Sequence, residues 1–425
     1  MHRHRAAGPS RPEGGPTDDG ERDAFMNWSI GRTSLTVATV AVFAVLAACT
    51  APSDSHTEPN ANAALGRASM AAKRTTTTVR RSATGTTPIS TTTVPRTSPT
   101  TTTVVPGSST SGGPSSGPAS SYITPGTRLG VGGCPIYPDD NVFHATITSL
   151  PVRSDSAAVL AAMGGARLTV RAGFSASVWE GSRLGLPINV VDSRTTPSVD
   201  VIGGLYNYLS DLSGHAIPAS PRIEGWPGMA WDRHLLLVDS ATCTSSEFFY
   251  VSPPWMNFAG RWAAETAVKV DLQTNLPRAR GTATASGTSM LAGLTRFDEV
   301  SSGEIDHVIG VAIPTIKTGV VNWPATGTDG RSSDPNAPAM GSWLRLRSDV
   351  DLSKLRPQAR VIARAMQRHG AMVVDTTVSG IALSGEPDLR WDDQDLATLG
   401  GLSAADFEIV DPTPMKIADG SYQIR

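Results

Sequence analysis

The stretch His234-Leu-Leu-Leu-Val-Asp239 is a short apolar run between polar residues, with the length and composition of one buried strand. Similar segments occur on both sides of it, each bounded by Gly, Pro, Asn or Asp: 168–171, 188–191, 267–271, 307–313 and 343–347. Short strands without an alternating series of strands and helices favour a mainly β fold, a β-sandwich or jelly roll, over a doubly wound sheet.

Helical spacing of apolar residues is confined to a few places. Three segments are predicted to be helices: 156–163, 357–368 and 393–398. In the second, one face is apolar, arginines occupy the other face, and Gly370 follows as a stop. We therefore expect one β-rich head domain over residues 129–425, with a few helices packed on its sheets.

Residues 50–128 are dominated by Thr, Ser, Pro, Gly and Ala and contain almost no aromatic side chains. Such a composition cannot bury a core, so residues 49–128 are predicted to be a disordered stalk below the head. The stalk carries net positive charge and the head net negative charge. This balance suits anionic lipid or wall polymer near the stalk and argues against nucleic acid as the partner of the head. The alternative is that the stalk is a solvated linker whose charges bind no specific partner.

An apolar run over residues 34–48 ends in Val45-Leu-Ala-Ala-Cys49, which resembles the lipobox of bacterial lipoproteins. The run is shorter than the about 20 residues that a transmembrane helix needs. Residues 26–48 are therefore expected to be a lipoprotein signal peptide, and residues 1–25 an extension upstream of the true start. The resemblance implies a diacylglyceride on Cys49 and a protein anchored at the extracellular face of the cell membrane.

The chain has three cysteines, and lipidation of Cys49 would leave Cys134 and Cys243. In an oxidising compartment the remaining pair is expected to form a disulfide, which would close a loop of about 110 residues. Two free buried thiols are the alternative. The cysteines lack the spacing of a structural zinc site, and we expect neither a metal nor another cofactor.

Several blocks of the head resemble a family of secreted bacterial proteins whose activity is not established. They include 134–141, 186–191, 223–225, 232–234, 294–300, 305–307, 385–391 and 407–410. The chain departs from the family pattern at two places. It has Phe143-His144 where relatives have Trp-Asn, and Asp375-Thr-Thr-Val378 where they have an Asp-Asn-Gly loop. The resemblance implies secretion and leaves the activity open.

Two short motifs resemble hydrolase motifs. Ser286-Gly-Thr-Ser-Met290 is similar to the nucleophile motif of subtilases, but the His and Asp motifs of that family are absent, so a protease is a remote alternative. Glu304-Ile-Asp306 resembles part of the catalytic strand of jelly-roll endoglucanases. On a strand Glu304 and Asp306 would face the same way, as paired catalytic carboxylates do; a solvated turn is the alternative.

A third set of candidates combines histidines with carboxylates. Asp232 and His234 alternate onto one face of a Leu-rich strand, and His307 shares a face with apolar neighbours. These side chains are either hydrogen-bonded core residues or a catalytic cluster in a cleft. Possible carboxylate partners are Glu224, Glu247 and Asp375. We expect at least two of the three candidates to lie within about 8 Å of each other, near a carboxylate.

Aromatic residues gather in one part of the head, interleaved with prolines. The tryptophans of this part are Trp226, Trp231, Trp255 and Trp262. They either fill the core or present flat rings to a glycan. The leading expectation is a monomeric surface lipoprotein that binds or hydrolyses a polysaccharide, as a glycoside hydrolase if it is an enzyme. A structural or adhesive envelope lipoprotein without a small-molecule site is the alternative.

Overall fold

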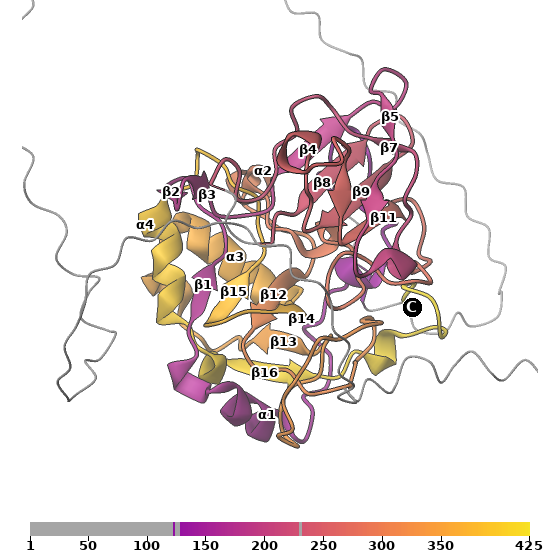
Figure 1. Ribbon diagram of the computed structural model, residues 1–425. Coiled ribbons are helices and arrows are strands. Elements are labelled where there is room, and N and C mark those ends of the chain that lie inside the picture. Colours follow the sequence, from indigo (N-terminus) through magenta and orange to yellow (C-terminus); the bar gives the residue numbers. More distant parts are fainter. Residues whose placement is uncertain (1–121, 124–127, 229–231) are drawn as a thin grey trace, which may run out of the picture. The chain divides into compact units, whose positions relative to one another are not determined.

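The structure, a computed structural model, describes residues 122–123, 128–228 and 232–425 (Figure 1). The predicted signal peptide, Cys49, Trp231 and nearly all of the predicted stalk lie outside these residues. Within the described part, no helix is both long enough and apolar enough to cross a bilayer.

The described chain consists mainly of strands with a few helices, which confirms the predicted fold class. The larger sheet has the strand order β1-β15-β12-β14-β13-β16. Its strands are β1 (Val170–Ala172), β12 (Ile309–Ile313), β13 (Trp343–Leu346), β14 (Ala371–Thr376), β15 (Ile381–Leu383) and β16 (Phe407–Val410).

A four-stranded sheet has the order β11-β9-β8-β4 and includes the Leu-rich segment. Its strands are β4 (Ile188–Val191), β8 (Leu235–Asp239), β9 (Thr244–Phe249) and β11 (Thr266–Asp271). Three small ladders complete the strands: β2 (Val178–Trp179) with β3 (Ser182–Arg183), β5 (Ser198–Val199) with β7 (His215–Ala216), and β6 (Ile202–Gly203) with β10 (Ala263–Ala264).

The helices are close to the predicted ones. They are α1 (Ser156–Met163), α2 (Phe297–Ser302), α3 (Pro357–Arg368) and α4 (Asp393–Leu396), the last continued by a 3-10 turn over Ala397–Gly401. Helix α3 buries Ile362, Ala365 and Met366, as its spacing predicts, and Gly370 beyond it has a φ of +79°. Helix α2, rich in acidic and Ser residues, was not predicted.

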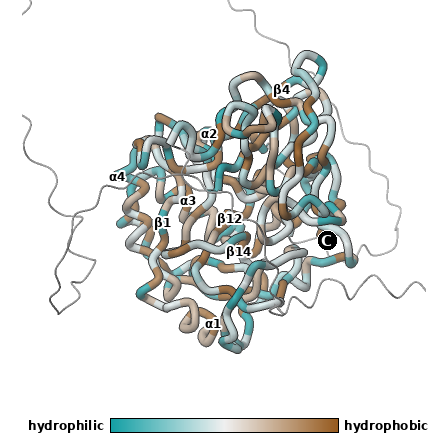
Figure 2. Tube along the Cα trace, in the orientation of Figure 1, coloured by the Kyte–Doolittle hydropathy of each residue, from teal (hydrophilic) through white to brown (hydrophobic). Residues whose placement is uncertain are grey.

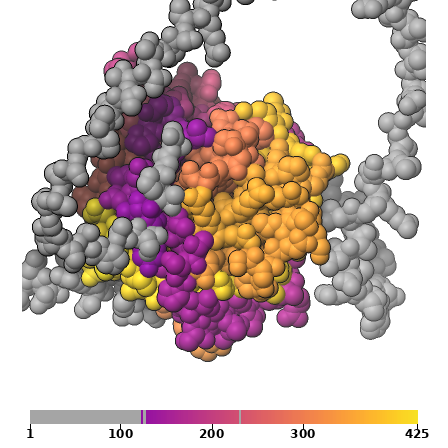
Figure 3. All heavy atoms as spheres, turned by 180° about the vertical axis from the view of Figure 1, so that it is seen from behind, coloured from indigo at the N-terminus to yellow at the C-terminus, as the bar shows by residue number. Residues whose placement is uncertain are grey.

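Both larger sheets mix parallel and antiparallel neighbours. Strand β4 runs parallel to β8, and β12 runs parallel to β14, whereas β8–β9 and β9–β11 are antiparallel. Segments far apart in the chain meet in the larger sheet, where β1 pairs with β15. Seen from behind, the later part of the chain forms a continuous orange and yellow surface beside the purple residues that begin the head (Figure 3).

The core explains why the Leu-rich segment is apolar throughout. Leu235 and Leu237 belong to one buried cluster, while Leu236 and Val238 belong to another that also contains Met372 of β14. Side chains on a strand alternate between its faces, so β8 is buried on both. The second cluster joins the two larger sheets. In Figure 2 hydrophilic, teal stretches lie largely in the outer loops.

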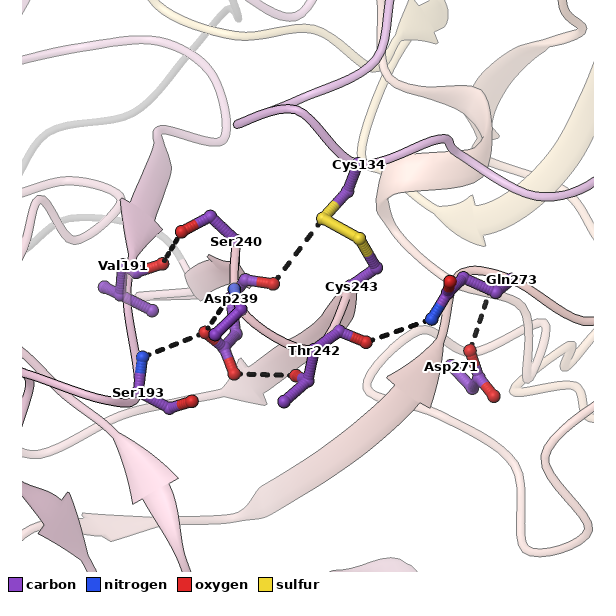
Figure 4. The surroundings of a disulfide bond; sticks show 10 residues. Cys134, Val191, Ser193, Asp239, Ser240, Thr242, Cys243, Asp271 and Gln273 are labelled. Atoms are coloured by element: carbon purple, nitrogen blue, oxygen red, sulfur yellow. Dashed lines mark hydrogen bonds between the residues drawn. A yellow bond between two sulfur atoms is a disulfide. The ribbon is translucent and has the colours of Figure 1, made fainter.

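The predicted disulfide links Cys134 and Cys243, which are separated by 109 residues and have Cα atoms 5.2 Å apart. Cys243 lies in the turn between β8 and β9, and Cys134 lies in the first described segment of the head (Figure 4). The bond therefore pins the start of the domain to its four-stranded sheet. Tyr122 and Ile123, which the composition assigns to the stalk, pack near this segment, and the Thr146 amide donates to the Tyr122 carbonyl.

Candidate functional site

His234 directly precedes β8 and is paired with Glu224. Its Nδ1 lies 2.7 Å from the Glu224 carboxylate, and its backbone amide donates to the same Oε2 at 3.1 Å. The Glu224 amide donates in return to the His234 carbonyl. His234 is only 9% exposed, and burial alone would lower its pKa; the Glu224 carboxylate outweighs this effect and raises the pKa. The pair is a charged hydrogen bond when His234 is protonated.

Two further carboxyl groups act on His234 through their charge. Asp232 is exposed, and partial desolvation together with the Glu224 charge raises its pKa. Asp375 lies near the end of β14, where burial raises its pKa to about 6 and the Asp329 charge adds to the effect. We refer to Glu224, Asp232, His234, Asp329 and Asp375 as the His234 cluster. The raised pKa values of Asp232, His234 and Asp375 in one place mark a candidate functional site.

A β-bulge sets the position of Asp375. The register of β12 with β14 passes from Val311 opposite Val373 to Ala312 opposite Asp375, which leaves Val374 as an extra residue. Bulges of this kind change the direction of the side chains beyond them and often lie next to active sites. The Thr376 amide donates to the Asp375 carboxylate at 2.8 Å and limits its movement.

Backbone strain is concentrated beside the cluster. Arg233 and Tyr250, neither of them Gly, have φ values of +49° and +53°, a region that costs L-residues roughly 1–2 kcal/mol each. The Tyr250 amide donates to the Asp232 carbonyl at 2.9 Å, and the Arg233 guanidinium carbon lies 3.6 Å from the centre of the Tyr250 ring. The loops before β8 and after β9 are thus tied together, which holds Asp232 in place.

Aromatic rings extend from the cluster onto the surface. His234 packs on Phe249 with ring centres 5.6 Å apart, and Phe249 packs on Tyr250 at 6.0 Å. Trp226, two residues after Glu224, lies 6.1 Å from Trp255. We call Trp226, Tyr250 and Trp255 the aromatic surface, and their exposed fractions are 40%, 44% and 55%.

The four predicted glycan-binding tryptophans divide into three groups. Trp226 and Trp255 are exposed, as a platform requires. Trp262 is 7% exposed and supports Trp255 from below, with ring centres 5.6 Å apart, so it packs in the core. Trp231 lies outside the described residues. Trp179, which the sequence did not single out, is 57% exposed on the β2–β3 hairpin.

His307 does not join the His234 cluster, so of the three candidates Asp232 and His234 are the two that interact, with Glu224 as the nearby carboxylate. The Nε2 of His307 lies 3.2 Å from the Glu299 carboxylate and its Nδ1 lies 2.7 Å from the Val308 carbonyl. His307 precedes β12 at its amino end, whereas Asp375 lies opposite Ala312 near the other end. At about 3.3 Å per residue, the strand places roughly 16 Å between the two positions.

Glu304 and Asp306 lie side by side in the segment that leads into β12, as the alternative to a catalytic strand predicted. They occupy the extended segment between α2 and β12. Desolvation raises the pKa of Asp306, and the charge of Glu304 and a hydrogen bond with it add to the rise. Arg368 contacts the Glu304 carboxylate and lies 3.9 Å from that of Asp306. These two carboxylates line the same cavity as His307 and lie away from His234.

Ser289, the nucleophile of the protease alternative, has no histidine as its partner among the residues that the structure describes. Its hydroxyl donates to the carboxylate of Glu247, which is fully buried. Glu247 also accepts from the Met290 amide and the Ser245 hydroxyl, each at 3.0 Å. A subtilase has a histidine in the place of Glu247, and Ser289 is only 4% exposed, so the geometry gives the subtilase reading no support.

Several members of the site could not be selected from the sequence. Glu224 and Asp375 were possible partners, whereas Asp329, Tyr250 and Arg233 carried no motif. Their proximity depends on the register of β8 with β9 and on the end of β14. Within the described residues, no group of three or more His, Cys, Asp or Glu side chains is arranged to hold a metal ion. Comparison of the chain with family models, curated proteins and solved structures gave no match.

Proposed function

We propose that the head domain binds a polysaccharide chain on the aromatic surface and hydrolyses it at the neighbouring carboxyl groups of the His234 cluster. The observation that carries this proposal is the direct connection between the two. The Tyr250 backbone amide donates to the main-chain carbonyl of Asp232, and Trp226 lies two residues from Glu224. Exposed rings therefore stand on the same short segments of the chain as the titratable groups of the His234 cluster.

Flat exposed rings suit sugar recognition because the apolar faces of pyranose rings stack on them, while hydroxyl groups stay available for hydrogen bonds. Trp226 and Trp255 contact each other edge to face, with an interplanar angle of 72°. Trp262 beneath Trp255 and the Arg233 guanidinium over Tyr250 restrict the movement of these rings. A restricted platform loses less entropy when a ligand binds.

Hydrolysis of a glycosidic bond needs one protonated and one ionised carboxyl group. Asp375, with a pKa of about 6, is suited to protonate the leaving oxygen in mildly acidic solution. Exposed Asp232, as a carboxylate, takes a proton from the water that attacks the anomeric carbon. The bond from that carbon to the leaving oxygen breaks, and each product ends in a hydroxyl group. His234, which Glu224 holds in place, interacts through its charge with the carboxyl groups of Asp232 and Asp375.

The location of the protein is part of the proposal. The Leu-Ala-Ala-Cys49 ending of the apolar run supports lipidation, and the Thr-rich stalk would carry the head away from the membrane. The Cys134–Cys243 disulfide fits an oxidising compartment outside the cytoplasm. A polysaccharide at the cell surface is then within reach of the aromatic surface.

The test uses the full-length protein in a binding and degradation screen of cell-wall and extracellular polysaccharides. We expect binding and slow release of reducing ends from at least one neutral polymer. Trp255→Ala should weaken binding at least tenfold, whereas Tyr208→Ala, which removes another exposed ring, should change it less than twofold. Asp375→Asn should abolish release of reducing ends and leave binding intact.

Three outcomes have different meanings. If the wild-type protein binds a polysaccharide without hydrolysing it, the aromatic surface is a binding site but the His234 cluster is not catalytic. This result would favour an adhesive lipoprotein. Hydrolysis that survives both Asp375→Asn and Asp232→Asn would place the chemistry elsewhere. If no polysaccharide binds, the proposed function is wrong.

A further inference from the structure

A cavity of about 270 Å³ lies beside the amino end of β12, at the opposite end of that strand from Asp375. Three parts of the chain line it: the segment that enters the domain, helix α2 and the segment before β12. The strand length puts it roughly 16 Å from the His234 cluster, so the two are separate places on the domain.

The lining of this cavity is polar and contains both donors and acceptors. The carboxylates are Asp139, Glu299, Glu304 and Asp306, and the groups that can donate include Arg296, His307 and Tyr137. Glu304 and Asp306 are 55% and 27% exposed at their side chains, so solvent and small solutes can reach them. Arg368 pairs with Glu304 and offsets part of the negative charge.

Arg296 supplies a second, independent observation. The residue is 5% exposed, and its terminal nitrogens donate to the Leu129 and Gly130 carbonyls and to the Glu299 carboxylate. Its Nε is buried and has no hydrogen-bond partner among the described residues. A buried donor without a partner costs about 1–3 kcal/mol, so the side chain of Arg296, a lining residue of the cavity, carries an unsatisfied hydrogen-bonding group.

We propose that this cavity binds one uncharged sugar unit, independently of the aromatic surface. Hydroxyl groups both donate and accept, which matches carboxylates and an unpartnered Arg296 N–H in one lining. The four carboxylates disfavour an anion such as a uronate, and the arginines paired with Asp139, Glu299 and Glu304 reduce the attraction for a cation. The volume equals that of roughly nine water molecules and lies just below the usual range of ligand pockets, which suits a single ring and not a polymer.

The experiment measures binding of single sugars to the full-length protein in detergent by titration calorimetry. The probes are glucose, galactose, mannose and N-acetylglucosamine, with glucuronate and glucosamine as charged comparators. We expect at least one neutral sugar to bind with a Kd of roughly 1 mM or below, and neither comparator to bind more tightly.

Two tryptophan substitutions on α2 give a matched pair. Ser302 lines the cavity, so Ser302→Trp should weaken sugar binding at least tenfold. Ser301 is its exposed neighbour and is not among the lining residues, so Ser301→Trp should change the Kd less than twofold. Both hydroxyls donate to a main-chain carbonyl one turn earlier in the helix, and equal melting temperatures would show that both variants fold.

Trp255→Ala separates this inference from the proposed function, since it should leave the affinity for single sugars unchanged. If Ser302→Trp does not fold, Glu304→Gln at the exposed rim should still weaken binding. The inference is overturned if no neutral sugar binds, if glucuronate or glucosamine binds more tightly, or if the cavity variants bind as the wild type does.

Discussion

The Nδ1 of His234 lies 2.7 Å from the carboxylate of Glu224, and each residue also hydrogen-bonds to the backbone of the other. This pair fixes the start of β8 against the preceding loop and brings a titratable side chain to the edge of the aromatic surface. The arrangement has a direct consequence for pH dependence.

Glu224→Gln should lower the pKa of His234, because the carboxylate is the main cause of its rise. A raised folded-state pKa stabilises the protein fully below the ordinary His value of about 6.5, and this contribution is lost as pH rises through the folded-state pKa. The substitution should therefore cost about 1–3 kcal/mol near pH 6 and less at pH 9. Urea unfolding at both pH values and NMR titration of His234 measure this. Equal losses at both would contradict it.

Buried His369 should make the protein less stable in acid. Burial lowers its pKa to about 3, so between pH 6.5 and 3 the unfolded chain binds more protons than the folded one, and stability falls as pH falls. The loss at pH 5 relative to pH 8 is about 2 kcal/mol from this residue.

His369→Asn provides the comparison, because it retains an N–H for the Ala145 carbonyl and cannot be protonated. The difference in unfolding free energy between pH 8 and pH 5 should shrink by about 2 kcal/mol in this variant. An unchanged difference would show that His369 is not the source. Asp375, whose pKa is raised to about 6, has the opposite effect on stability in acid, and this effect is the same in the wild type and the variant, so it cancels in the comparison.

Removal of the Cys134–Cys243 disulfide should destabilise the head strongly. The bond spans 109 residues, and the chain-entropy estimate for such a loop is about 4–5 kcal/mol. Urea unfolding of the double variant Cys134→Ser/Cys243→Ser measures the loss, with Cys49→Ala as the control that keeps the bond. Two alkylatable thiols in exported wild-type protein would contradict the pairing.

Gly370→Ala should be far more damaging than Gly303→Ala. Both glycines have positive φ, +79° and +95°, so both substitutions carry a backbone cost of about 1–2 kcal/mol. A Cβ at Gly370 would lie 2.6 Å from side-chain atoms of Ile147 and Trp343, whereas one at Gly303 meets nothing within 4 Å. The packing conflict adds about 1–3 kcal/mol. Thermal unfolding compares the two, and similar losses would contradict the prediction.

Cys49→Ala should block lipoprotein processing, because lipidation needs the thiol of Cys49. The unprocessed protein should disappear from the detergent-soluble lipoprotein fraction. Globomycin, which inhibits lipoprotein signal peptidase, should have the same effect on processing of the wild type. Processing that continues in the presence of globomycin would reject the lipobox.

Much of the fold could be predicted because its signals are local. Helix α3 has the predicted bounds Pro357–Arg368, since one apolar stripe and Gly370 specify a helix without reference to other segments. Strand β4 is likewise predicted at Ile188–Val191. Helix α2 was not predicted because it buries the acidic Glu299 in place of an apolar residue. That burial depends on the ion pairs of Glu299 with Arg296 and His307.

The sequence by itself determined the mainly β class, the principal helices, the cysteine pair and the candidate residues. These features depend on composition, on the spacing of apolar residues and on an even number of remaining cysteines, which can all be read along the chain. Only the tertiary structure decided which candidates meet. The packing of the four-stranded sheet on the larger one and the bulge in β14 let the charges of His234 and Asp375 interact, and the length of β12 keeps His307 away. Such relationships depend on pairing between distant segments, and a shift of one residue would turn every side chain to the other face.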